Sequence, residues 1–422
     1  MSLPIRHLPV FQNWDCHVCG NCCKEYIVTI TPDERARIEQ QPWEGDEVVG
    51  GRPLFRKAGP YWARRDQLNT RPDGSCVFLS EAGRCRIHER FGYAAKPLPC
   101  RLFPFVLVPV GDHWRVGMRF ACPSTAANKG RNIPQHAEAL REFADELALR
   151  EGLDKTPGKQ QRPPLLQKGQ RVAWADLLRF VQALVQIMRD SNDRVERRIR
   201  KGIALAELCR QARFDQVSGS RLGEFLQMLR ISLEEEVPLE PALVAPPRRI
   251  GKLLFRQVAA IFTRKDRGPD KGLPQKHRLA LMLAAWNFAR GEGAVPRLHA
   301  KMAEATFEEI ERRPTELTPE AEKILERYYV IKIDSLQFCG AAQFGLPFWE
   351  GLELLFLTFP IVLWVVRILH HLPREEAVCQ ALTIVDDHFG YNRVLSSSRQ
   401  RLVLKLLARS GDLSRLVAWY SR

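Results

Sequence analysis

Residues 16–23 read Cys-His-Val-Cys-Gly-Asn-Cys-Cys and place four thiols within eight positions. Two-residue gaps let neighbouring thiolates converge on one centre, because the intervening backbone can turn back toward the sulfur atoms, and Gly20 supplies the flexibility for such a turn. Cys22 and Cys23 are adjacent, so their side chains point apart and need not bind the same ion. In a reducing compartment this spacing favours metal ligation over disulfide bonds. We therefore expect a metal centre at this stretch.

The cysteines of the whole chain fall into two classes. Of 11 cysteines, eight precede residue 130, and we expect them to be metal ligands: Cys16, Cys19, Cys22, Cys23, Cys76, Cys85, Cys100 and Cys122. The other three, Cys209, Cys339 and Cys379, are isolated in apolar or helical contexts and are expected to be small buried residues. Eight ligands suffice for one or two metal centres.

The identity of the metal stays open between iron–sulfur and zinc. Tetrahedral zinc takes four ligands, so eight cysteines can serve two sites. An iron–sulfur cluster also needs four thiolates, and a Cys-x2-Cys-x2-Cys run with a distant Cys-Pro pair, here Cys122-Pro123, is ferredoxin-like. In ferredoxins the run continues to a Cys-Pro three residues later, whereas here Cys23 follows at once. We favour an iron–sulfur centre of the 4Fe–4S type, with zinc as the alternative.

The segment around Cys100, Pro-Leu-Pro-Cys-Arg-Leu-Phe-Pro at residues 97–104, completes a longer pattern. Together with the first cysteine run it resembles the YkgJ-like cysteine-cluster family, which is described as zinc- or iron-chelating. The residues that fall on the family pattern are Cys16, Cys19, Cys22, Cys23, Cys85, Cys100, Arg101 and Pro104. This resemblance covers about residues 14–125 and implies a metal-chelating domain.

A subset of that family, the flagellin lysine N-methylases, has a long helical region after the cysteine cluster. Residues 326–330, 344–348 and 354–369 look similar to that region. The resemblance implies a protein lysine N-methyltransferase that depends on S-adenosylmethionine and contains an iron–sulfur centre. A Cys-x3-Cys-x2-Cys signature, which would suggest radical chemistry on S-adenosylmethionine, is absent, because Tyr26 stands where the third cysteine would be.

Two further side chains near the cysteines are candidates for the site. Arg101 directly follows Cys100, so its cation can stabilise thiolate charge or hold a substrate carboxylate, and we name it as a cofactor-binding residue. An exposed arginine is the alternative. His88 stands three residues after Cys85 and can ligate zinc, although a hydrogen-bonded structural histidine is the favoured interpretation. The sequence shows no nucleophile elbow, Walker loop, dinucleotide fingerprint or H-E-x-x-H motif, so no catalytic residue is assigned.

Length and composition indicate a folded protein of more than one domain. The chain has 422 residues, 45% of them hydrophobic and 27% charged, which excludes intrinsic disorder as a description of the whole. We predict an α-rich α+β fold. A small cysteine-rich metal-binding domain with a short β-hairpin occupies residues 1–130, and an all-α region occupies residues 131–422. The proline-rich stretch near 237–250 is a candidate further boundary.

Local patterns predict the individual elements. Residues 26–30 alternate and predict a strand, and Thr31 and Glu34 form a capping box that begins a helix through about residue 41. Residues 105–110 and 113–120 predict a hairpin that leads to Cys122. Apolar residues at helical spacing predict helices at 172–189, 222–233, 279–289, 321–333 and 402–419. Loop-like stretches rich in proline or basic residues lie at 155–170, 237–249 and 264–276.

The net charge is +15, which favours acidic partners without choosing among them. Basic residues concentrate at 194–201 and 248–278, where solvated helix faces explain them adequately and the support for nucleic-acid binding is weak. A protein partner or substrate fits the charge as well. The run of glutamates at 234–236 is expected on a solvated helix face.

The most apolar segment, residues 354–366, is bounded by Glu353 and Arg367, contains Pro360 and is shorter than the roughly 20 residues of a spanning helix. We expect a buried helix there and no transmembrane segment. The first 15 residues lack the apolar core of a secretory signal, so we expect a cytoplasmic protein.

Three functional hypotheses follow. The first is a metal-binding cysteine-cluster protein, iron–sulfur rather than zinc, that acts as a protein lysine N-methyltransferase with S-adenosylmethionine. The second is a non-catalytic zinc-binding structural or protein-interaction module, in which the ligands fill every position on the ion. The third is a metal-handling protein.

Overall fold

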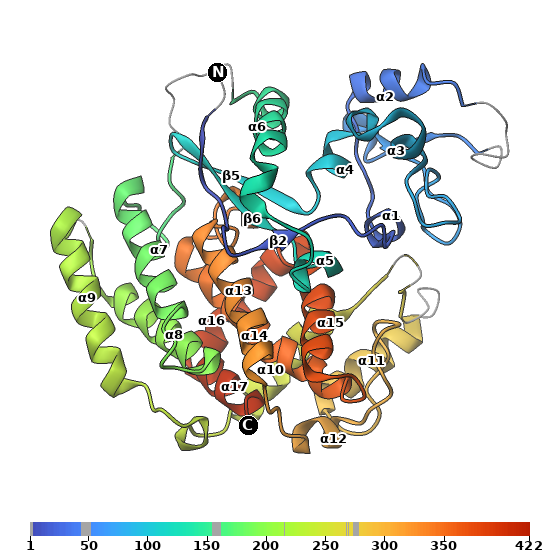
Figure 1. The fold of residues 1–422 in the computed structure, drawn as a ribbon. Coiled ribbons are helices and arrows are strands. Elements are labelled where there is room, and N and C mark those ends of the chain that lie inside the picture. Colours follow the sequence, from blue (N-terminus) through green and yellow to red (C-terminus); the bar gives the residue numbers. More distant parts are fainter. Residues whose placement is uncertain are drawn as a thin grey trace.

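The computed structural model describes residues 3–43, 52–153, 162–214, 216–266, 268, 270–272 and 278–422, apart from the side chains of Arg278 and Ala280. Short strands lie in the first 132 residues and helices follow (Figure 1), so the predicted α+β class is confirmed. Parts of two expected loops, residues 155–161 and residues 267, 269 and 273–276, lie outside the described residues.

The N-terminal part combines short strands with short helices. Its strands are β1 (Ile5–His7), β2 (Asn13–Trp14), β3 (Phe55–Ala58), β4 (Arg65–Leu68), β5 (Phe105–Val110), β6 (His113–Met118) and β7 (Arg131–Asn132). Its helices are α1 (Asn21–Glu25), α2 (Pro32–Glu39), α3 (Arg86–Phe91), α4 (Leu98–Leu102) and α5 (Pro123–Ala126). The capping box that begins α2 is present, with Thr31 and Glu34 bonded to each other's backbone as predicted.

The predicted hairpin forms the main sheet. β5 and β6 pair antiparallel, and β1 adds to β6 in parallel, giving the order β1-β6-β5. Gly111 makes the turn at φ 61°, a left-handed conformation that glycine adopts without strain. The hairpin carries the chain from Cys100 in α4 to Cys122, as the sequence predicted.

The predicted strand at residues 26–30 is wrong. Only Thr29 forms a bridge, to Gln67, while the amides of Ile30 and Leu68 bond the carbonyls of Asp66 and Val28. The pairing with β4 is limited to residues 28–30, between the end of α1 at Glu25 and the start of α2 at Pro32.

The helical region contains twelve longer segments among the described residues. They are α6 (Ala137–Glu151), α7 (Trp174–Met188), α8 (Val195–Gln211), α9 (Gly219–Glu236), α10 (Arg249–Thr263), α11 (Arg278–Arg290), α12 (Phe307–Arg312), α13 (Pro319–Asp334), α14 (Phe348–Ile368), α15 (Arg374–Asp386), α16 (Ser398–Arg409) and α17 (Asp412–Tyr420). The helix predicted at 402–419 is instead two helices, because Gly411 adopts φ 71° between α16 and α17.

Helix α14 is the centre of the helical region and is buried along its whole length. It is the described helix that is long and apolar enough to cross a membrane, and its most apolar window is entirely inside the protein. The predicted buried helix is confirmed but is longer than expected. Glu353 and Arg367 lie inside it, because Arg210 pairs with Glu353 and backbone carbonyls accept from Arg367.

Two hydrophobic cores hold the molecule together. The larger core joins the β5–β6 hairpin, α6 and all the central helices. A satellite core lies under α2 and α3 and contains Ile30, Ile38, Val77, Phe78 and Ile87. In Figure 1 this satellite unit, drawn in blue, stands to one side of the hairpin and above α11 and α15.

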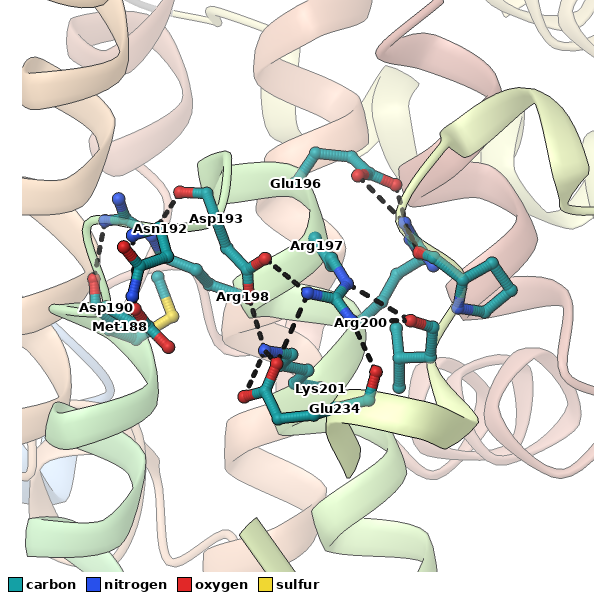
Figure 2. Close-up of polar contacts among 12 residues, drawn as sticks. Met188, Asp190, Asn192, Asp193, Glu196, Arg197, Arg198, Arg200, Lys201 and Glu234 are labelled. Carbon is teal, nitrogen blue, oxygen red and sulfur yellow. Dashed lines mark hydrogen bonds and ion pairs between the residues drawn. The ribbon is translucent and has the colours of Figure 1, made fainter. Parts of the chain in front are cut away.

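Apart from the exposed Arg194, the basic run at residues 194–201 is buried, which corrects the expectation of a solvated helix face. Arg200 and Lys201 of α8 are 1% and 2% exposed. Lys201 lies between Asp193 and Glu234, and Arg200 pairs with Glu196 (Figure 2). These cations therefore neutralise carboxylates inside the protein and are not on its surface.

Candidate metal centre

The eight N-terminal cysteines sit on loops and helix ends that converge between the satellite core and the hairpin. Gly20 adopts φ 70° as the N-cap of α1, which carries Cys22 and Cys23. Cys85 and Cys122 are the N-cap residues of α3 and α5, and Cys100 lies in α4. All eight are free thiols. The fold thus collects ligands from a span of more than a hundred residues.

Backbone hydrogen bonds fix the distant cysteines relative to one another. The amide of Cys76 donates to the carbonyl of Cys23 at 2.7 Å, and Cys85 bridges to Leu79. The buried carboxylate of Glu34 accepts from the amide of Leu98 at 2.6 Å, which holds α4 and Cys100 against α2. Glu34 was expected only as a helix cap, and its second role has no signal in the sequence.

The thiols line two adjoining cavities. The large cavity, of about 330 Å³, is lined by five of them: Cys22, Cys23, Cys76, Cys85 and Cys100. The small cavity, of about 60 Å³, is lined by Cys16, Cys19, Cys22, Cys100 and Cys122. All eight predicted ligands are therefore brought to one region, and Cys22 and Cys100 face both cavities.

The satellite core distinguishes the adjacent residues Cys22 and Cys23, because only Cys23 packs against it. Cys76 is buried in that core, and Cys23, Cys85 and Cys100 pack against it. Cys122 instead belongs to the larger core, while Cys16 and Cys19 are exposed. The sulfur atoms of Cys22 and Cys23 are 4.0 Å apart. Four thiols therefore contact the satellite core, and Cys22 lies beside Cys23 where the two cavities meet.

The sulfurs of Cys22 and Cys23 lie at about the separation that a single ion requires. Four sulfurs around tetrahedral zinc lie about 3.8 Å from one another, given a Zn–S bond of about 2.3 Å. Among the described residues, no three cysteine sulfurs all lie within 4.8 Å of one another. A cluster of several metal atoms holds its thiolates farther apart than one ion does. The donor set fits a thiolate-bound centre of zinc or iron.

Burial keeps several of these thiols protonated. It raises the pKa of Cys76 to about 12 and raises the pKa of Cys100 well above the ordinary value. The contact with Cys23, together with burial, raises the pKa of Cys22 in the same way. Because a metal binds the thiolate form, loading this site must release protons.

Lys96 is the cation that faces the thiols. It lines both cavities, and within the described part of the chain its ammonium group has no carboxylate partner. Burial lowers the pKa of Lys96, but Cys100 and Cys85 raise it by more. Sequence reasoning missed Lys96, because three residues separate it from the nearest cysteine, Cys100.

Arg101, the predicted cofactor-binding residue, is buried, and its partners are residues other than the cysteines. Its guanidinium pairs with Glu146 of α6, donates to the backbone carbonyl of Lys96 at 3.0 Å and lies over Phe143. It lines neither cavity. Arg101 thus positions the backbone of Lys96, and direct contact with a cofactor stays a prediction. His88 packs its ring against Tyr93.

Part of the wall of the large cavity is aromatic and cationic. It consists of Tyr26, Phe103, Arg119 and Tyr391. The Arg119 guanidinium lies 4.5 Å from the ring centre of Tyr26 and 3.6 Å from that of Tyr391. Tyr391 comes from the loop after α15, so no spacing in the sequence links it to the cysteines.

An ion-pair network joins this wall to the helical region. Lys265 contacts Asp387 at 2.6 Å and Glu25 of α1 at 3.0 Å. Burial raises the pKa of Asp387, but Lys265 and Arg119 lower it by more, to about 2. The carboxylate of the neighbouring Asp386 accepts a hydrogen bond from the backbone amide of Phe120 at 2.6 Å. The helical region therefore holds both α1 and the strand end that carries Arg119.

Comparison with known proteins identifies the N-terminal part. Residues 15–123 match the family described as "CxxCxxCC: Putative zinc- or iron-chelating domain". The YkgJ-like resemblance noted in the sequence agrees with this match. No curated protein and no solved structure matches the chain. The match supports binding of zinc or iron by the cysteine cluster.

Proposed function

From the zinc- or iron-chelating domain at residues 15–123, we propose that this chain is an iron–sulfur protein with two four-cysteine sites. A 4Fe–4S centre at the large cavity takes Cys23, Cys76, Cys85 and Cys100. The second site takes Cys16, Cys19, Cys22 and Cys122, which reproduces the ferredoxin-like Cys-x2-Cys-x2-Cys run with a distant Cys-Pro pair.

The single observation that carries this proposal is the division of the thiols by the satellite core. Four cysteines contact that core, and the other four do not. The Cys-x2-Cys-x2-Cys run with its distant Cys-Pro pair supports a cluster over a single zinc ion. Lys96, which faces both groups, supplies positive charge where a thiolate-bound centre carries negative charge.

Removal of one cysteine from each group tests the division. Cys76→Ser should remove the iron of the first site, and Cys16→Ser should remove that of the second, each leaving about half of the iron and sulfide if both sites hold 4Fe–4S clusters. Loss of all metal in both variants would contradict two separate sites. Colourless protein with zinc in place of iron would favour the non-catalytic structural module.

We propose protein lysine N-methylation as the activity. The support is the similarity of the helical region to that of flagellin lysine N-methylases, together with a cavity that has room beside the thiols for a small molecule. In this reaction the methyl group leaves the sulfonium of S-adenosylmethionine and bonds to the neutral lysine nitrogen, which then releases a proton to water. A cluster held by Cys23, Cys76, Cys85 and Cys100 would supply charge beside the reactants.

The activity is tested with metal-loaded protein, radiolabelled S-adenosylmethionine and a lysine-rich protein acceptor. Label in the acceptor supports methylation. Absence of S-adenosylmethionine binding by isothermal titration of the metal-loaded protein would exclude it, and the chain would then be a metal-binding module or a metal-handling protein.

A further inference from the structure

The large cavity is bigger than a metal centre needs. Its volume of about 330 Å³ falls at the lower end of the range of small-molecule sites, about 300 to 1,000 Å³. Its lining combines thiols with Tyr26, Phe103, Arg119 and Tyr391. The aromatic part of the wall is where an organic molecule would lie.

Arg119 is a buried cation with spare hydrogen-bonding capacity. Its side chain is 7% exposed. A guanidinium carries five N–H donors, yet the hydrogen bond found for Arg119 is one of 3.3 Å, from Nη2 to the carbonyl of Asp387. Within the described residues Nε has no acceptor at all. The nearest carboxylate oxygen, also of Asp387, is 3.5 Å away, and Lys265 already contacts that carboxylate at 2.6 Å.

Arg115, on the same segment, has closer acceptors than Arg119, although its Nε also lacks an acceptor among the described residues. It is equally buried, and its Nη1 donates to the carbonyl of Asp334 at 2.6 Å and to the Asp334 carboxylate at 3.1 Å. Arg119 has no comparable partner. Its stacking between Tyr26 and Tyr391 fixes the plane of the guanidinium while leaving donors for a further acceptor.

A polar surface cleft borders the large cavity and shares Tyr26 and Ile27 with it. Ile27 is itself exposed. The cleft carries charges of both signs: Glu25, Arg56, Asp73, Asp266 and Lys271.

We propose that the large cavity binds the carboxylate end of an amino-acid-type ligand, with Arg119 as its anchor. Arg119 would donate a charge-assisted pair of hydrogen bonds to the carboxylate, and the apolar body of the ligand would lie on Tyr26, Phe103 and Tyr391. Two sources share this chemistry: a free amino acid and S-adenosylmethionine, which ends in an amino acid. The second source rests on the proposed function, whereas the site itself does not.

The test compares ligands that differ by one group. Isothermal titration of the metal-loaded protein would use S-adenosylmethionine, its decarboxylated analogue and methionine. Loss of the carboxylate should weaken binding by about 10- to 100-fold, because hydrogen bonds to charged groups are worth that much. Arg119→Gln should weaken the binding of S-adenosylmethionine by a similar factor. It should also abolish the difference in affinity between S-adenosylmethionine and its decarboxylated analogue. Arg115→Lys is the matched control and should retain the difference in affinity between S-adenosylmethionine and its decarboxylated analogue.

Each outcome decides a different question. If methionine binds with dependence on Arg119 but S-adenosylmethionine does not, the site stands and the proposed methylation fails. If the decarboxylated analogue binds as well as S-adenosylmethionine to the natural protein, the proposal is overturned, and this comparison needs no folded variant. It is equally overturned if neither methionine nor S-adenosylmethionine binds.

Discussion

The backbone amide of Cys76 donates a 2.7 Å hydrogen bond to the carbonyl oxygen of Cys23, across fifty residues of chain. This bond joins the loop after β4 to helix α1, so a ligand from the first cysteine run and a ligand from the middle of the domain face the same cavity. The metal centre therefore depends on the tertiary fold. Loss of one ligand should weaken metal binding by the remaining ligands.

Cys76→Ser is predicted to lose the metal of the large cavity and to destabilise the satellite core. Cys76 is buried and contacts that core, so the variant loses a ligand and the folding free energy that metal binding supplies. The matched control is Cys209→Ala, a buried cysteine of α8 remote from the cluster. Metal analysis and thermal unfolding of both variants provide the check. Equal metal content in the two would contradict the assigned ligands.

Lys96→Met is predicted to lower the reduction potential of the centre by tens of millivolts. Lys96 lines both cavities, and removal of its positive charge makes the addition of an electron less favourable. Lys96→Arg keeps the charge and should stay close to the natural potential. Redox titration followed by absorption spectroscopy measures the effect. An unchanged potential in Lys96→Met, with iron content preserved, would show that Lys96 does not influence the centre.

Stability is predicted to fall as the pH drops from about 6.5 to about 4, in part because of His299. Burial lowers the pKa of His299 to about 4, while its neutral ring accepts a hydrogen bond from the amide of Lys301. The unfolded chain binds a proton near pH 6.5 and the folded chain does not, so this contribution is complete above pH 6.5 and is lost as pH falls through about 4.

Urea unfolding at several pH values measures this dependence. His299→Gln should flatten it between pH 6.5 and 4, whereas the same change at the exposed His371 should not. A pH profile that His299→Gln leaves unaltered would refute the role of this histidine. The groups around His299 include Asp270, Lys301 and Lys265, so the ionic strength should be held constant.

Lys201→Met is predicted to reduce the free energy of unfolding by about 3 kcal/mol, as expected when one partner leaves a buried ion-pair network. Lys201 lies between Asp193 and Glu234 (Figure 2), and Asp193 is 5% exposed. Arg194→Ala, which breaks the exposed pair with Glu322, should cost less than about 1 kcal/mol. Urea midpoints give the comparison, and metal content should stay constant. Equal losses in the free energy of unfolding at the two positions would mean that burial does not strengthen the ion pairs of Lys201.

The sequence predicts local features of this fold better than tertiary ones. The capping box of Thr31 and Glu34 and the turn at Gly111 depend on neighbouring residues, and both form as expected. The burial of Lys201 and the length of α14 depend on partners that are distant in the chain. The family pattern found the cysteines because their spacing is itself the signal. Lys96, Arg119 and Tyr391 have no such spacing, and only the folded chain brings them to the thiols.

The most direct test of the iron–sulfur proposal is anaerobic purification followed by an absorption spectrum and by iron, zinc and acid-labile sulfide analysis of the same sample. The account predicts brown protein that absorbs near ~400 nm and contains iron and sulfide in equal amounts. Colourless protein with stoichiometric zinc and no sulfide would contradict it.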